Sequence, residues 1–385
     1  MKNLNTLRLL LLPTLLFSQL SISHEINSTS LEQAEHSNVS AKLNVTNQYL
    51  KTHHPELSPN TFNSLKKAAL QGDPEAEYQL AWIYLKDPSI PFLKSPIELL
   101  RKSAAQGNTN ALKSLALMYE YGLGGVQSNE EASKLYKKAF NDYAKEAKQG
   151  NAEAQYNLAW MYDSGKGIEQ SEQKAFQWYE RSANQGFPPA QLALGIMYEN
   201  GTGVEESETK AFQWYEKAAK QNNAEAQIQL AYLYKEGKGI EKSKEKSLYW
   251  QHKAAEQGYR IALFELGSNS DLQDTNKQEN IIQYNLKFLN SKYIAAKMPQ
   301  NILNEKERID RMYTLAIDNL TAAYEENPKV CLEFANQGEP FAQYALGIAY
   351  TDKPKTFKEG MKWLKKSAAQ GNELAKSYLE TIIEE

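Results

Sequence analysis

GNAEAQYNLAWMYDSGKGIEQSEQKAFQWYERSANQ, residues 150–185, is followed by two further versions of itself at residues 186–221 and 222–257. Equivalent positions lie 36 residues apart from one copy to the next. A fixed period of this size is typical of stacked helical hairpins, each of which is too small to bury its own apolar face. The sequence therefore predicts a repeat array, and the rest of the chain is interpreted by comparison with these three copies.

Each copy has the pattern of two helices joined by a glycine turn. Ala154, Leu158 and Tyr162 are spaced by four residues, which places them on one face of a first helix. Two glycines in residues 164–168 can adopt the positive φ that ends a helix and reverses the chain. A second apolar stripe in residues 175–183 predicts the returning helix.

Four of the six tryptophans share one position in the predicted second helices: Trp178, Trp214, Trp250 and Trp363. Aromatic residues that recur in register are more typical of packing between repeats than of a ligand-binding site. We therefore expect these rings to be buried in the core.

The alanine–leucine–tyrosine stripe, the G-x-G turn and the motifs K-A-x-x-W-Y and A-A-x-Q-G together resemble the Sel1-like repeat, a slightly longer relative of the tetratricopeptide repeat. The resemblance covers about Gln71 to Lys376. It implies an all-α fold: a right-handed α/α superhelical solenoid of Sel1-like, TPR-like hairpins. It also implies a non-enzymatic scaffold or adaptor that binds a protein or peptide in its concave groove. Exported bacterial members of the family act in envelope or signalling complexes, and those of intracellular pathogens act in host-cell interaction and virulence.

Residues 1–23 have the pattern of a secretory signal peptide. Lys2 and Arg8 precede an apolar run at residues 9–17, and small residues at 21–23 predict cleavage after Ser23. The alternative, a membrane anchor, is disfavoured because the run is too short to span a bilayer. The sequence thus predicts an exported protein, periplasmic or secreted, without stable membrane insertion.

The remaining chain divides by composition and pattern. We expect a long helix at residues 304–326, a final helix at residues 373–383, and a second helix extended by about two turns at residues 139–145. A lone helix from about residue 58 would cap the start of the array. The predicted parts are a polar linker at 24–57, a repeat array at 58–267, degenerate helical repeats at 268–336, and a last repeat with a capping helix at 337–385.

The net charge and the cysteine content limit the classes of partner that we expect. The formal net charge of −3 gives no broad attraction to nucleic acid, so we expect no nucleic-acid partner. Cys331 is the single cysteine and cannot form an internal disulfide, in contrast with the cysteine-rich relatives of this family. We expect Cys331 to be buried in a monomer, and the alternative is a disulfide-linked dimer.

No motif in the sequence predicts catalysis or a cofactor. There is no HExxH, CxxC, GxSxG or phosphate-binding glycine loop, and the histidines show no metal-ligand spacing. Some cysteine-rich relatives are described as acting on β-lactams, and this chain has Ser-x-x-Lys at Ser64, Ser171, Ser207 and Ser243. We interpret all four serines as helix caps. A cell-wall or β-lactam-acting enzyme and a purely structural envelope protein stay open as alternatives.

The candidate binding residues come from the first helices. Alignment with the tetratricopeptide pattern places the positions two before and two after each stripe leucine in the groove. This row consists of Tyr78, Trp82, Lys113, Leu117, Tyr156, Trp160, Leu192, Ile196, Ile228, Tyr232, Phe264, Tyr344 and Ile348. All but Lys113, Leu192 and Phe264 are the predicted partner-binding residues, because exposed apolar side chains in a row mark an interaction site. The alternative is that tight curvature buries the row.

Overall fold

The computed structural model describes residues 59–86, 94–123, 127–268, 275–290, 303–326, 328–351 and 354–384. In these ranges the regular secondary structure is helical throughout, without a strand. The predicted signal peptide and linker lie outside the described residues. None of the described helices is long and apolar enough to cross a membrane.

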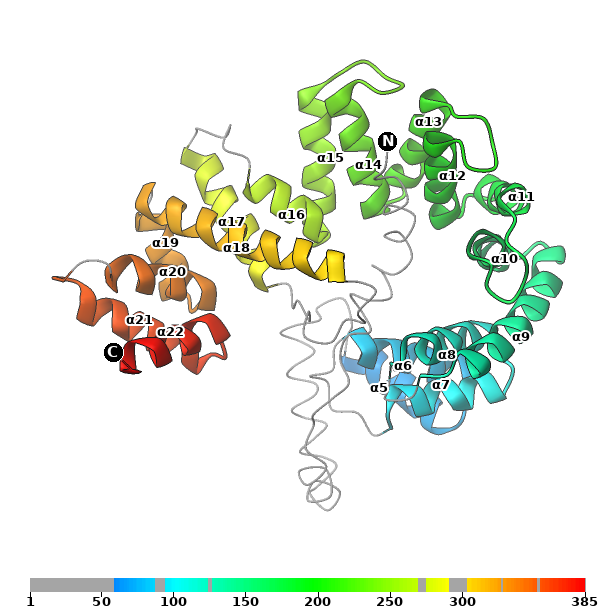
Figure 1. The fold of residues 1–385 in the computed structure, drawn as a ribbon, viewed down its shortest axis with the longest axis horizontal. Coiled ribbons are helices and arrows are strands. Elements are labelled where there is room, and N and C mark those ends of the chain that lie inside the picture. Colours follow the sequence, from blue (N-terminus) through cyan, green and yellow to red (C-terminus); the bar gives the residue numbers. More distant parts are fainter. Residues whose placement is uncertain are drawn as a thin grey trace. The chain divides into compact units, whose positions relative to one another are not determined.

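The described helices fall into two compact units, whose boundary lies within one helix after Ala190. The first unit holds helices joined in consecutive hairpins, which Figure 1 shows in blue to teal. Its helices are α5 (Pro59–Leu70), α6 (Pro74–Lys86), α7 (Pro96–Ala105), α8 (Thr109–Tyr121), α9 (Asn129–Lys148), α10 (Ala152–Ser164) and α11 (Glu172–Asn184).

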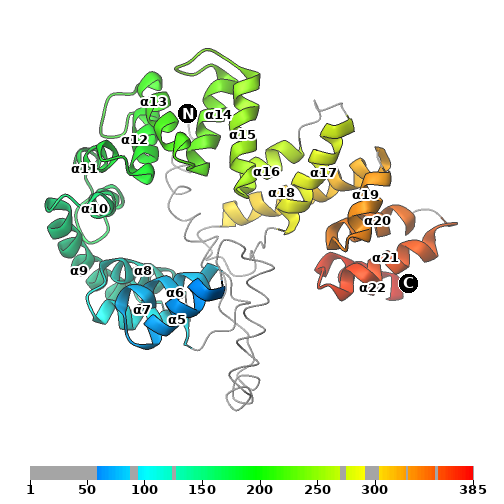
Figure 2. The ribbon, with the colours of Figure 1, turned by 180° about the vertical axis from the view of Figure 1, so that it is seen from behind.

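The second unit continues the same hairpin pattern, and Figure 2 shows its helices from the opposite side. Its helices are α12 (Pro188–Asn200), α13 (Glu208–Lys220), α14 (Ala224–Glu236), α15 (Lys244–Glu256), α16 (Arg260–Gly267), α17 (Thr275–Asn290), α18 (Leu303–Glu326), α19 (Pro328–Asn336), α20 (Pro340–Thr351), α21 (Phe357–Ala369) and α22 (Glu373–Glu384). Residues 268–336, predicted as degenerate repeats, contain α17, α18 and α19.

Several predicted helices are confirmed. α5 precedes the first hairpin as a lone helix, and α9 is 20 residues long, whereas α11 and α13 have 13 each. The long helix and the final helix are present as α18 and α22.

Cys331 is 2% exposed, and its burial raises the pKa of the thiol to about 12.

Helix ends follow local capping rules. Asn151 precedes α10 and its side-chain oxygen accepts a hydrogen bond from the Ala154 N–H at 2.9 Å. Ser171, Ser207 and Ser243 cap α11, α13 and α15 in the same way, as predicted. The prediction for Ser64 is wrong: this serine lies inside α5 on its exposed side, because the helix already begins at Pro59.

The core between the helices consists mainly of alanine, leucine and tyrosine. Ala154, Leu158 and Tyr179 are each at most 3% exposed, so the predicted stripes do form the seam. The expectation for the recurring tryptophans holds for Trp363, which is 7% exposed, but Trp178, Trp214 and Trp250 are half-buried. Their rings lie at the edge of the seam, and basic side chains cover two of them: Arg181 lies 4.4 Å from the Trp178 ring centroid and Lys217 3.8 Å from that of Trp214.

A buried glutamine links consecutive repeats, and the sequence analysis missed it. Gln155 donates to the Ala147 carbonyl at 3.0 Å and accepts from Gln185 at 2.7 Å. Gln155 on α10 therefore links the end of α9, the second helix of the preceding repeat, to the end of α11, the second helix of its own repeat. The same pair of bonds recurs at Gln227 with Ala219 and Gln257, and at Gln343 with Ala335 and Gln370. We call Gln155, Gln227 and Gln343, with their partners, the glutamine ladder. A buried polar group with all its partners in place fixes the register of the helices that it joins.

The second glycine of each G-x-G turn serves the backbone, as predicted. Gly167 has φ +74°, and a Cβ built there would lie 2.6 Å from the Tyr136 carbonyl oxygen. The turn therefore packs against the second helix of the preceding repeat with no room for a side chain. Gly239 has φ +66° and makes the same close approach to Glu208 in the second unit.

Candidate interaction surface

The row predicted on the first helices has mixed exposure. Tyr232 is 42% exposed, and Leu117 and Trp160 are each 4% exposed. The prediction that these last two form an accessible surface is therefore wrong, because they pack inside the first unit. The other predicted partner-binding residues are half-buried: Tyr78, Trp82, Tyr156, Ile196, Ile228, Tyr344 and Ile348.

Aromatic contacts hold several of these half-buried side chains in place. The rings of Tyr78 and Trp82 meet edge to face with centroids 6.3 Å apart on α6. Tyr156 on α10 lies between Tyr179 and Phe187, at centroid distances of 5.6 and 5.4 Å. Held aromatic rings lose little entropy when a ligand packs against them, which suits them to binding.

A polar cluster interrupts the apolar row between α8 and α10. Lys113 Nζ donates to Asn157 Oδ1 at 2.6 Å, and Asn157 Nδ2 lies 3.4 Å from Asn110 Oδ1. The same Asn110 oxygen accepts from the Tyr143 hydroxyl at 2.5 Å, and Asn110 Nδ2 donates to Glu153 at 3.1 Å. The cluster thus joins α8, α9 and α10, and we call it the Lys113 cluster.

The cation in this cluster is poorly solvated. Lys113 Nζ lies 5.5 Å from the centroid of the Trp160 ring, and burial lowers the pKa of Lys113 to about 8. Glu153 is the carboxylate that favours the charged form and partly offsets the effect of burial. The sequence placed Lys113 in the row. Its place in the repeat did not show that the ammonium would be partly enclosed by α10.

The second unit presents an apolar face at the same positions. Leu192 is 8% exposed and Ile196 and Ile228 are half-buried, while Lys238 lies 5.1 Å from the centroid of the exposed Tyr232 ring. The hydrogen bond between Lys238 and Tyr232 raises the pKa of Lys238.

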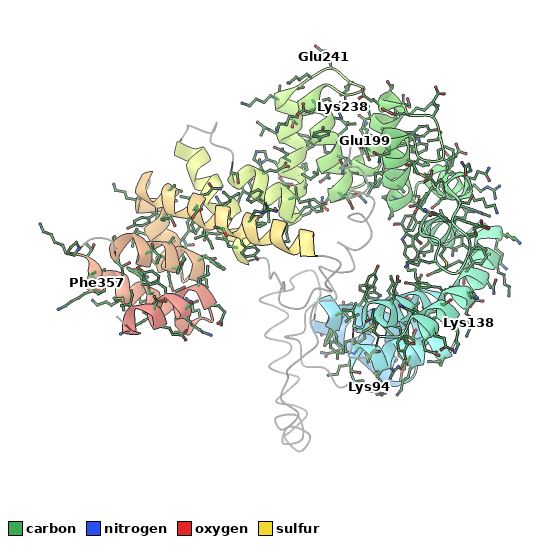
Figure 3. The ribbon with its side chains drawn as sticks, viewed as in Figure 1. Lys94, Lys138, Glu199, Lys238, Glu241 and Phe357 are labelled. Carbon is green, nitrogen blue, oxygen red and sulfur yellow. The ribbon has the colours of Figure 1, made fainter. Side chains whose placement is uncertain are left out.

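Two acidic residues lie on the helices that carry this face, Glu199 on α12 and Glu225 on α14. Figure 3 labels Lys238 and Glu199, and Glu199 accepts a hydrogen bond from the Tyr215 hydroxyl at 2.6 Å. Glu225 begins the same face on α14, and burial raises its pKa to about 7. The second unit therefore has a poorly solvated acid at its first-helix face, where the first unit has a poorly solvated base.

Three of the four Ser-x-x-Lys sequences place the serine on a backbone N–H and the lysine over a tyrosine ring. Ser171 Oγ accepts from the backbone N–H of Lys174 at 3.4 Å, while Lys174 Nζ lies over the Tyr162 ring at 5.3 Å. The pairs starting at Ser207 and Ser243 have the same geometry, with lysines over Tyr198 and Tyr234. Within the described part of the chain, no group of three acidic, histidine or cysteine residues could hold a metal ion.

A protein-family model described as Sel1 repeat matches the chain six times. The matched residues are 74–91, 109–141, 152–187, 188–223, 224–259 and 340–372. These segments contain Gln155, Gln227 and Gln343 of the glutamine ladder and every member of the first-helix row except Phe264. Comparison with curated proteins gives no match.

Similar solved structures come from bacteria. A protective antigen of uropathogenic Escherichia coli strains is 25% identical, with 93% of this chain and 82% of that chain covered and a TM-score of 0.40. A Sel1 repeat protein from Oxalobacter formigenes is 23% identical, with 71% and 96% covered and a TM-score of 0.40. An immunity protein of Pseudomonas aeruginosa is 20% identical, with 63% and 81% covered and a TM-score of 0.38.

Proposed function

Because the chain belongs to the Sel1-repeat family, we propose that it is an exported interaction scaffold that binds a protein or peptide along the first helices of its hairpins. Sel1 repeats generally mediate protein–protein interaction, which makes scaffolding the function expected of six copies. The proposal includes no catalytic step.

The observation that carries the proposal is the accessible aromatic side chain of Tyr232, 42% exposed in a row of half-buried apolar residues. Tyrosine offers a large, stiff contact area and a hydroxyl, and such residues dominate binding energy at protein interfaces. Half-buried neighbours such as Ile228 exclude water around the anchor without contributing much themselves.

Export is part of the proposal and rests on residues 1–23 of the sequence. Cell fractionation and N-terminal sequencing test it. A chain beginning at His24 in the periplasm or the medium supports export, and an intact N-terminus in the cytoplasm contradicts it.

The binding surface is tested with Tyr232→Ala in affinity capture from envelope extract and from host-cell lysate in parallel. We expect at least a tenfold weaker binding of a saturable partner, because the anchor is lost while the seam is untouched. An envelope partner would assign the scaffold to the periplasm, and a host-cell partner would assign it to host interaction and virulence.

Tyr249→Ala is the matched control. Tyr249 is 53% exposed, but it lies on the second helix α15, where it contacts the Trp250 ring at a centroid distance of 5.1 Å. The proposal fails if both variants weaken the partner equally, or if Tyr232→Ala retains full binding.

A further inference from the structure

Lys113 is the one cation at the row positions of the described first helices, where the other members are aromatic or aliphatic. Its side chain is half-buried between α8 and α10, with the Trp160 ring 5.5 Å away. A lysine in such a setting could release its proton, or its side chain could turn into solvent. The position of its ammonium beside the aromatic row therefore calls for an explanation.

Hydrogen-bond donors outnumber acceptors around this ammonium. Lys113 has three N–H donors, and the described residues give it one acceptor, Asn157 Oδ1 at 2.6 Å. The indole N–H of the neighbouring Trp160 is buried and has no acceptor among the described residues, and Trp160 is 4% exposed. The indole N–H is enclosed, so only the ammonium of half-buried Lys113 is open to a partner, and an added acceptor there would form a charge-assisted hydrogen bond.

We propose that the Lys113 cluster binds the side-chain carboxylate of an Asp or Glu in a peptide that lies along the first helices of the first unit. This inference rests on the proposed function and names the chemistry of its partner. A carboxylate supplies a negative charge to Lys113 and acceptor oxygens to its remaining N–H donors.

The row supports a carboxylate within a peptide rather than one at its end. Apolar side chains lie on both sides of α8, with Tyr78 and Trp82 on α6 and Tyr156 on α10. A peptide that contacts both neighbours must continue past Lys113 in both directions. The expected motif is therefore an acidic residue flanked by apolar residues.

The charge on Lys113 gives the site a pH dependence. Burial lowers the pKa of Lys113 to about 8, so the unliganded site loses its charge in mildly alkaline solution. Glu153 from α10 is the acid that faces it, and Tyr78 from α6 and Tyr143 from α9 have pKa values raised by burial, to about 12 for Tyr78. The tyrosines therefore keep their protons while Lys113 titrates.

The test uses the full chain and a peptide library with acetylated N-termini and amidated C-termini. The central residue is fixed as Glu, Gln or Lys, and the flanks are random apolar residues. We expect central Glu to be enriched at least tenfold over Gln at pH 7, and this preference to fall several-fold at pH 9.5. A second library with central Gln and a free C-terminal carboxylate examines the chain end.

Lys113→Met and Lys113→Gln remove the charge, and Lys138→Gln is the control. Lys138 is an exposed lysine of α9 that Figure 3 labels, and its substitution changes the net charge equally. We expect the preference for Glu to be lost in both Lys113 variants and kept in Lys138→Gln. The melting temperatures of both Lys113 variants are measured to show that they fold, because loss of the lysine leaves the buried Asn157 Oδ1 without its donor.

The two proposals fail in different ways. Equal enrichment of Glu and Gln, with apolar flanks still selected, overturns the carboxylate site and leaves the scaffold in place. A preference for Glu that survives in folded Lys113→Gln also overturns it, as does selective capture of the free C-terminus. If no peptide is enriched from any library, the scaffold function along this row is contradicted as well.

Discussion

The first-helix faces of the two units differ although the hairpins behind them are alike. In the first unit, Lys113 on α8 bonds Asn157 on α10 and lies against a buried tryptophan. In the second unit, the same positions on α12 and α14 carry aliphatic residues and the exposed Tyr232. One face combines a half-buried cation with aromatic rings, whereas the other is apolar with one accessible ring.

The difference shows which positions of the repeat are free to vary. The glutamine ladder and the second turn glycine recur in both units, because each is fixed by contact with the backbone of the preceding repeat. The first-helix row differs between the units: the first unit carries Lys113, whereas the second carries Ile196, Ile228 and the exposed Tyr232. Binding properties can thus differ along one chain on a constant frame.

The largest expected effect tests the constant frame. Gly167→Ala places a Cβ 2.6 Å from the Tyr136 carbonyl at φ +74°, and we expect a loss on the order of 3 kcal/mol in the free energy of unfolding. Gly239→Ala should cost a similar amount in the second unit. Urea unfolding followed by circular dichroism measures both.

Gly165→Ala is the control within the same turn. It has φ +71°, but the atom nearest to its Cβ would be Gln170 Cβ at 3.4 Å and backbone atoms would lie at 3.8 Å, which is ordinary contact, so we expect a loss of about 1 kcal/mol. Equal losses of unfolding free energy in Gly165→Ala and Gly167→Ala would show that the close approach to the Tyr136 carbonyl is not the reason for glycine at position 167.

The next effect sharpens the contrast between the two half-buried titratable groups, Glu225 and Lys113. The folded-state pKa of Glu225 is raised to about 7 from an ordinary value of 4.5, so the parent loses stability as pH rises from about 4.5 through 7. Glu225→Gln cannot ionise. We expect the two proteins to match at pH 4 and the variant to be more stable at pH 8, by on the order of 2 kcal/mol.

Lys113→Met should show the opposite charge behaviour in the alkaline range. The pKa of Lys113 is lowered to about 8, so the parent gains stability relative to this variant as pH rises from about 8 toward 10.5. Thermal melts from pH 4 to pH 10 measure both differences. Parallel curves for parent and variants would show that neither charge is desolvated.

The smallest expected effect tests the ladder in each unit. Gln155→Ala removes the partner of Gln185 and of the Ala147 carbonyl, and Gln227→Ala does the same in the second unit. We expect each to cost about 1–2 kcal/mol, because buried polar groups lose their hydrogen bonds. Gln229→Ala, at a half-buried position of α14 outside the ladder, should cost little. A ladder variant as stable as Gln229→Ala would refute the stabilising role of these bonds.

Three features that the sequence analysis did not identify share one cause. The ladder, the burial of Trp160 and the environment of Lys113 all depend on residues about 30 to 47 positions away in the chain. The regular recurrence of Gln155, Gln227 and Gln343 was visible in the sequence. Glutamine at a helix surface is ordinary, so only the hydrogen bonds between helices revealed its role.

By itself, the sequence determined the hairpin repeat, the capping serines at Ser171, Ser207 and Ser243, the extended α9 and the turn glycines. These features follow from local rules of helix periodicity, capping and backbone sterics that act within one or two turns. Only the tertiary structure decided which members of the first-helix row are accessible, excluding Leu117 and Trp160 and leaving Tyr232 exposed. Exposure and solvation are set by the side chains of neighbouring repeats, and a residue's position within its own repeat does not specify them.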